Sequence, residues 1–232
     1  MRTNLYFFLF ISSVMLSCNQ QKVESTSGVI SATKSNITEK AISNMHWMNP
    51  PQSFEVVDST LLVTVSKGTD FFNNPEDSAV VGSAPYLYKE VAGDFIAKAI
   101  VQPDFSSQWN AVALIVHLDS LNWIKFAFEN SDATGPGIVS VVTKGTSDDA
   151  NGVILNKEKK VWLAIARKDN IYALHWSLDG KNFNMTRLTS MPNQEVIKIG
   201  IEAQSPVGDS ATHQIHFFEI EKITTEDLRN IN

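Results

Sequence analysis

Residues 111–130 read AVALIVHLDSLNWIKFAFEN and contain two short apolar runs separated by a turn. Side chains alternate between the two faces of a β-strand, so Ile124, Phe126 and Phe128 of the second run share one wholly apolar face. The turn at 119–120 is Asp-Ser, a pair that favours tight hairpins. This stretch predicts two neighbouring antiparallel strands with one face in a hydrophobic core.

The same pattern extends on both sides of this hairpin. From Trp47 onward, short runs rich in Val, Ile and Phe alternate with turn residues, and no helical pattern lies between them. Many short strands without helices predict an all-β sandwich or barrel. The candidate strands are 53–57, 60–66, 86–90, 94–102, 111–118, 122–130, 137–144, 161–168, 171–178, 196–203 and 213–223.

The N-terminus has the features of an export signal. Residues 1–4 (MRTN) are weakly positive, and residues 5–16 (LYFFLFISSVML) form an apolar run too short to cross a bilayer. Ser17 then precedes Cys18, which resembles a bacterial lipobox. We therefore expect Cys18 to be lipidated after cleavage and to anchor the chain in a bacterial cell envelope, at the outer membrane or cell surface. The alternatives are an uncleaved anchor and an ordinary signal peptide with an incidental cysteine.

The composition divides the chain into four parts. Cys18 is the only cysteine, so no internal disulfide is possible. The stretch after it is polar, rich in Ser, Thr, Asn and Gln, and predicts a flexible tether. The last residues allow one helical turn. The expected parts are 1–17, the signal peptide; 18–45, the lipidated cysteine and tether; 46–224, the sandwich; and 225–232, the tail.

The charges and histidines exclude several classes of partner. The net charge is -6 and no Lys/Arg cluster is present, which argues against nucleic acid. His117 and His175 stand singly in strands, and His213 and His216 are too few for a metal cluster. We expect no metal site and no cofactor, although the acidic turn at 148–152 leaves calcium open as a minority possibility.

Several short motifs resemble the DUF1349 family. The resemblance covers residues 46–223 and implies a two-sheet antiparallel β-sandwich, a jelly roll of the concanavalin A-like lectin/glucanase type. Relatives occur appended to glycoside hydrolases, so the resemblance also implies carbohydrate binding. The matching motifs are 69–72 (TDFF), 122–125 (NWIK), 140–148 (SVVTKGTSD), 161–163 (VWL), 177–180 (SLDG) and 217–218 (FF).

The second face of strand 122–130 suggests a ligand site. It carries Trp123, Lys125 and Glu129, and the loop at 68–88 adds further aromatic and amide residues. Sugars are held by aromatic faces together with planar polar groups. The candidate ligand-binding residues are Asp70, Phe72, Tyr86, Tyr88, Trp123, Lys125 and Glu129. The alternative is structural: Phe71 and Phe72 plug one end of the sandwich, and Lys125 and Glu129 form a surface pair.

Three functions are compatible with these residues. The first is a non-catalytic carbohydrate-binding lipoprotein, with a glycan as partner and the membrane contacted through the lipid anchor alone. The second is a glycan-active enzyme using Glu129, with Asp70 or Glu202 as a second carboxylate. The glucanase signature Glu-x-Asp-x-x-Glu and the Gly-x-Ser-x-Gly elbow are both absent, so the sequence identifies no catalytic residue firmly. The third is a structural or protein-interaction module of the envelope, and the oligomeric state is left open.

Overall fold

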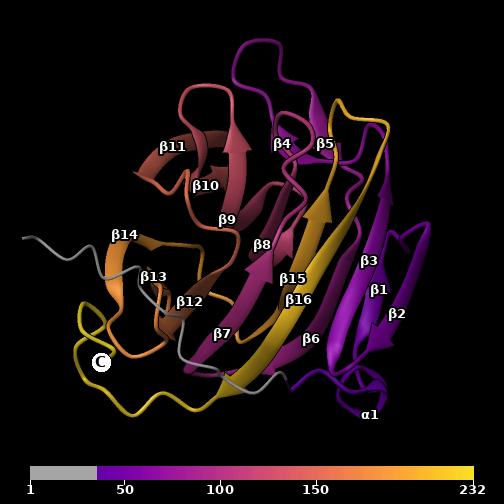
Figure 1. Ribbon diagram of the computed structural model, residues 1–232. Coiled ribbons are helices and arrows are strands. Elements are labelled where there is room, and N and C mark those ends of the chain that lie inside the picture. Colours follow the sequence, from indigo (N-terminus) through magenta and orange to yellow (C-terminus); the bar gives the residue numbers. More distant parts are fainter. Residues whose placement is uncertain (1–35) are drawn as a thin grey trace, which may run out of the picture.

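The computed structural model describes residues 36–232 as two seven-stranded antiparallel sheets and a two-stranded hairpin (Figure 1). The first sheet has the order β1 (His46–Met48), β6 (Tyr86–Ala92), β15 (Val196–Gln204), β8 (Ala111–Asp119), β9 (Asn122–Ser131), β10 (Gly135–Lys144) and β11 (Thr146–Ile154). The second sheet has the order β14 (Asn184–Ser190), β13 (Ile171–Ser177), β12 (Val161–Lys168), β7 (Phe95–Gln102), β16 (Ser210–Glu221), β3 (Thr60–Ser66) and β2 (Ser53–Val57). The hairpin pairs β4 (Phe71–Asn73) with β5 (Val80–Gly82), and one short helix, α1 (Glu39–Ile42), precedes the strands.

The hydrophobic core lies between the two sheets, as the alternation in strand β9 predicts. Ile124, Phe126 and Phe128 are fully buried there. Their strand pairs with β8 in a register that places Phe126 opposite Leu114 and Phe128 opposite Val112. Because β-strands alternate their side chains, the same register places Trp123, Lys125 and Glu129 on the opposite side of the sheet. We call that side the outer face of the first sheet.

The expected all-β fold and all eleven expected strands are confirmed. Five further strands were not predicted: β1, β4, β5, β11 and β14. Three of them, β1, β4 and β5, have three residues each, which is too short for a pattern. Strand β11 reads TSDDANGVI and is mostly exposed at the edge of its sheet, as is β14, so neither needs an apolar face.

The folded part begins earlier than expected at the N-terminus. Within the expected tether, Asn36 Nδ2 donates to the Phe218 carbonyl at 3.1 Å, and Ile37 is buried in the main core. Thr38 then caps α1, since its hydroxyl accepts from the Ala41 amide. Ordered structure therefore includes residues 36–45, which the sequence places in the tether. The expected signal peptide and Cys18 lie outside the described residues.

The C-terminal tail covers the outer side of the second sheet instead of forming the expected helical turn. Figure 1 shows it in yellow, ending beside β14. Leu228 is buried there, and His175 Nε2 donates to its carbonyl at 2.9 Å. The tail follows an irregular path because its apolar side chains, Leu228 and Ile231, pack one at a time onto the surface of the sheet. No helix in residues 36–232 has the length and apolar character needed to span a membrane.

Gly200 marks a close approach of two strands in the first sheet. It lies opposite Tyr88 in the pairing of β15 with β6. A Cβ atom added there would lie 2.0 Å from the Leu87 carbonyl oxygen, which is far inside contact distance. Any larger residue must therefore push β6 and β15 apart.

We expect Gly200→Ala to lower the free energy of unfolding by about 3 kcal/mol, because overpacking shifts backbone that cannot move freely. Urea denaturation measures this change. Gly82→Ala is the matched control, since its added Cβ meets Phe71 at an ordinary 3.5 Å, and its effect should stay within about 0.5 kcal/mol. Equal stability of the two variants would contradict the close approach.

Candidate functional site

Four of the buried polar side chains on the outer face of the first sheet form a group around the Lys125 ammonium. Lys125 is 3% exposed, Glu129 7%, Glu202 0% and Gln204 1%. Asp70, which precedes β4, joins them through Lys125. We call these five residues the polar cluster. Charged side chains are rarely buried unless they are paired, so this cluster needs a physical explanation.

A floor of alanines makes room for the lysine. Ala113 lies opposite Ala127 on β9 and opposite Glu202 on β15, and Ala111 lies opposite Glu129 and Gln204. Lys125 itself lies level with Ile115, yet its Nζ reaches Gln204 Oε1 at 2.9 Å. The aliphatic stem therefore runs along the sheet over the small alanine side chains. Larger residues at these positions would block its path.

The ammonium of Lys125 is the only cation within the polar cluster. It donates to Asp70 Oδ1 at 3.2 Å and to Gln204 Oε1. Burial alone would lower the pKa of Lys125, but the carboxylates of Asp70, Glu202 and Glu129 raise it above its ordinary value. The lysine is therefore charged, and the carboxylates around it compete for a single positive charge.

The two glutamates hold their protons unusually tightly. Burial raises the pKa of Glu129 from 4.5 to about 7, although the Lys125 ammonium pulls it down. Burial likewise raises the pKa of Glu202 from 4.5 to about 8 against the same ammonium. Neither carboxyl oxygen of Glu202 has a hydrogen-bond partner among residues 36–232. Because its pKa lies near 8, Glu202 is mostly protonated at neutral pH, and its carboxyl group is closed off from solvent.

The β4–β5 hairpin folds over an aromatic group next to the polar cluster. Phe71 meets Trp123 edge-on at 5.9 Å and Tyr86 at 6.3 Å between ring centroids. Asn73 fixes the hairpin, since its Nδ2 donates to the carbonyls of Ser120 at 3.1 Å and Gly145 at 2.9 Å. The hairpin thus covers Trp123 and Tyr86, which are 1% and 0% exposed.

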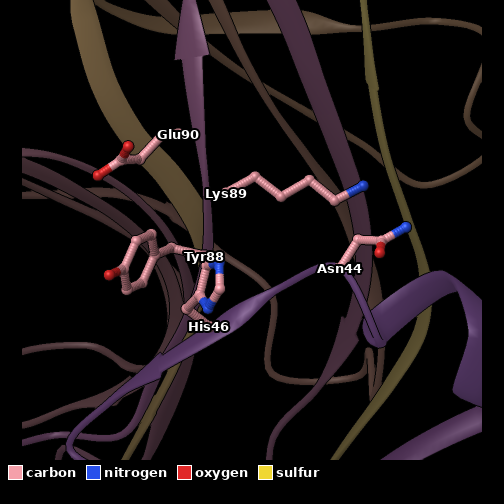
Figure 2. Close-up of a pocket in the computed structure, with 5 residues that line it drawn as sticks. All are labelled: Asn44, His46, Tyr88, Lys89 and Glu90. Carbon is pink, nitrogen blue, oxygen red and sulfur yellow. The ribbon is translucent and has the colours of Figure 1, made fainter.

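Tyr88 is the half-exposed end of this aromatic row. Its ring stacks on Tyr86 with centroids 5.3 Å apart, and Lys198 Nζ lies 5.7 Å from its centroid. Figure 2 shows Tyr88 beside His46 in a pocket at the edge of the sheet, with Glu90 on the same side and Lys89 pointing the other way toward Asn44. This pocket gives an open aromatic surface next to the covered rings.

The structure brings three of the expected site residues, Asp70, Lys125 and Glu129, directly together. Phe72 and Tyr88 are partly exposed beside them and pack against the same aromatic group. Tyr86 and Trp123 are buried in the aromatic group, so a ligand cannot stack on their rings, and they pack beneath the site instead. The surface-pair alternative for Lys125 and Glu129 was wrong, because both are buried. Phe71 does not plug an end of the sandwich either, since it packs on the outer face of the first sheet against Trp123 and Tyr86.

Two residues of this region were missed from the sequence. Gln204 follows Glu202 by two positions, and the strand period could have placed both on one face. Trp109 lies in the loop before β8, and its carbonyl accepts from Gln204 Nε2 at 2.9 Å. No sequence pattern identifies that contact, because it joins residues far apart in the chain. Among residues 36–232, no three His, Cys, Asp or Glu side chains are placed to hold a metal ion.

We expect the stability of the folded chain to fall as the pH rises from 6.5 to 8.5. The folded state binds more protons than the unfolded state until the pH passes the raised pKa of Glu202, near 8, so each rise in pH favours unfolding. One carboxyl contributes at most about 1.4 kcal/mol per pH unit. Glu202→Gln should flatten the dependence measured by urea denaturation, while Glu76→Gln, on an exposed turn, should keep it. An unchanged slope in Glu202→Gln would contradict the protonated state.

Known proteins resemble this chain in both sequence and fold. "Regulation of enolase protein 1" of Saccharomyces cerevisiae is 27% identical over 161 residues, which is 69% of this chain and 80% of that protein. A solved structure of a functionally unknown S. cerevisiae protein has a TM-score of 0.74 at 22% identity, covering 79% of this chain and 99% of that one.

Two more distant structures have the same sandwich fold. The GH43 protein BlXynB of Bacillus licheniformis has a TM-score of 0.62 at 12% identity, covering 78% of this chain and 37% of that one. The exoplasmic/lumenal domain of VIP36, in a form bound to Ca²⁺ and Man3GlcNAc, has a TM-score of 0.53 at 10% identity, covering 83% and 90%. The fold is therefore a lectin-like or glycosidase-like β-sandwich. The model described as "Protein of unknown function (DUF1349)" matches residues 47–223, and the chain belongs to this family.

Proposed function

We propose that this chain is an exported lipoprotein whose sandwich binds glycans without cleaving them. The observation that carries the proposal is the outer face of the first sheet, where the polar cluster lies next to an aromatic row that ends at the half-exposed Tyr88. Sugar rings present apolar faces and many hydroxyl groups, so a site for them combines a flat ring with polar side chains.

The distant structures support this class of ligand at a coarse level. VIP36 was solved with a mannose-containing oligosaccharide, and the other neighbours include GH43 glycoside hydrolases. Fold alone does not determine function, so the proposal rests on the residues of the site, and the likeness only agrees with it.

The carboxyls of the site favour binding over hydrolysis. A glycosidase needs one protonated acid and one ionised nucleophile or base. Glu129 and Glu202, with pKa values of about 7 and about 8, could supply the acid, and Asp70, ion-paired with Lys125, could be its partner. Both glutamates are buried, however, at 7% and 0% exposed, which keeps them from a substrate. The enzyme hypothesis using Glu129 therefore ranks second. A structural or protein-interaction module of the envelope is the third possibility.

Export and anchoring are proposed from Cys18 and the apolar run before it. When the full chain is expressed in a bacterium, we expect it to enter the detergent-rich phase of a Triton X-114 separation, because acyl chains bind detergent micelles. Cys18→Ala should move to the aqueous phase or stay unprocessed. Equal partitioning of both proteins would contradict lipidation.

We expect neutral polysaccharides to retard the protein in native affinity gels, and Tyr88→Ala to weaken this binding about tenfold. An exposed aromatic face contributes about 0.5–1.5 kcal/mol to stacking, which corresponds to up to about tenfold in affinity. Phe54→Ala is the matched control, since Phe54 is an aromatic residue that is 48% exposed on the second sheet.

The same mixtures are assayed for new reducing ends. Retardation without product supports the binding protein. Product that disappears in Glu129→Gln would support the enzyme instead. Neither retardation nor product would contradict both, and co-purification of a partner protein would then favour the interaction module.

A further inference from the structure

Trp109 differs from every other tryptophan in the chain. All five tryptophans lie in residues 36–232, and four of them pack in hydrophobic clusters: Trp47, Trp123, Trp162 and Trp176. Trp109 belongs to none of the clusters formed by the described residues, yet it is half-buried in a loop. A single aromatic residue outside the core is not unusual in itself, so its conformation and contacts decide whether it has a role.

The backbone of Trp109 is held in a conformation that large residues rarely adopt. Its φ is +61°, in the left-handed region. Two hydrogen bonds hold it there: its amide donates to the Asn130 carbonyl at 2.7 Å, and its carbonyl accepts from Gln204 Nε2. Strained residues of this kind persist only where the surroundings fix them, and they occur often at ligand sites.

The loop that carries Trp109 is fastened along its length. Asn130 Nδ2 donates to the Ser107 carbonyl at 3.0 Å, and Asn110 Nδ2 donates to the Asp104 carbonyl at 3.0 Å. The Asp104 amide in turn donates to Nδ1 of the buried His213. The indole is therefore presented by a preorganised loop, which lowers the ordering cost of binding.

Gln204 connects this loop to the polar cluster. Its Nε2 donates to the Trp109 carbonyl at 2.9 Å while its Oε1 accepts from Lys125 Nζ at 2.9 Å, and Lys125 also donates to Asp70. Trp109, on one loop, and Asp70, at the start of the hairpin, are thus linked through one buried ammonium. This geometry makes Gln204 a positioning residue for the tryptophan.

The charges near the loop disfavour an acidic ligand. The Asn130 carbonyl accepts a hydrogen bond from the Trp109 amide, and Asn130 directly follows Glu129 in the chain. Burial raises the pKa of Glu129 most, and Asp149, Asp70 and Asp132 raise it further, so several carboxyls share this end of the sheet. The Lys125 ammonium is already paired with Asp70. A ligand that donates hydroxyl groups fits these acceptors, whereas a ligand carboxylate meets like charge.

We propose that Trp109 is the stacking platform of the glycan site and that the ligand is a neutral oligosaccharide, its ring faces on the indole and its hydroxyls toward Asp70, the member of the polar cluster whose side chain is partly exposed. This inference rests on the proposed function, and it names residues and a ligand class that the proposed function leaves open.

The test measures dissociation constants for the full-length protein by isothermal titration calorimetry. The neutral probes are cellohexaose, xylohexaose, laminarihexaose and mannohexaose, and the acidic probe is hexagalacturonate. We expect at least one neutral probe to bind, Trp109→Ala to weaken it about tenfold, and Trp109→Phe to stay within about threefold of the wild type. Phe54→Ala is the control for loss of an exposed aromatic residue elsewhere.

Gln204→Glu tests the positioning role, because it keeps an oxygen for Lys125 and removes the donor to Trp109. We expect it to weaken neutral binding several-fold in the wild-type background and to add nothing in the Trp109→Ala background, as coupled residues do. Subtracting the fluorescence spectrum of the Trp109→Phe variant isolates the emission of Trp109. We expect this emission to differ between the wild type and Gln204→Glu. A general loss of structure would instead weaken both backgrounds equally.

The outcomes separate the two proposals. No binding of any probe by the wild type would overturn the proposed function and this inference with it. Neutral binding that is unchanged in a folded Trp109→Ala would overturn the platform and leave the proposed function standing. Binding of hexagalacturonate alone would overturn the neutral ligand class. Should Trp109→Ala fail to fold, Gln204→Glu in the wild-type background and protection of Trp109 from iodide quenching by ligand decide the matter, and a bound ligand that gives no protection would overturn the platform.

Discussion

The burial of one ammonium group organises the outer face of the first sheet. Lys125 is 3% exposed, and its ammonium donates hydrogen bonds to Asp70 and Gln204, with the carboxyl groups of Glu129 and Glu202 close by. Removing a charge from water is costly unless partners compensate it. The four partners come from three parts of the chain: Asp70 precedes the hairpin, Glu129 lies with Lys125 on β9, and Glu202 and Gln204 lie on β15. The ammonium therefore fixes the relative positions of the elements that surround the proposed ligand site.

Strand β9 serves the core and the site at once. Ile124, Phe126 and Phe128 pack between the sheets, and the alternate residues Lys125 and Glu129 enter the polar cluster. Small residues beside them, Ala111 and Ala113 on β8, leave the space that the lysine stem needs. Each sheet of a β-sandwich has an outer face that lies outside the main core. On the first sheet of this chain, the polar cluster and the β4–β5 hairpin cover that face.

Sequence alone predicts much of the fold and part of the site. The alternation in residues 122–130 places Phe126 in the core and Lys125 with Glu129 on the other face, because the period of a strand is local. It does not predict that β15 lies next to β8, so the contact of Lys125 with Gln204 is invisible in the sequence. The burial of Trp123 likewise depends on a hairpin that folds back from residues 71–82. Edge strand β11 escapes prediction because its exposed residues need no apolar pattern.

The central claim is that a neutral glycan binds the outer face of the first sheet at the network joining Lys125, Gln204 and Trp109. The most direct measurement is a ¹H–¹⁵N NMR titration of the side-chain amide and indole signals with xylohexaose and the other neutral hexaoses. The account predicts that the Trp109 indole and the Gln204 amide shift together and saturate, while the indoles of Trp47, Trp162 and Trp176 stay fixed. Shifts confined to those three indoles, or no saturable shift with any neutral hexaose, would contradict it.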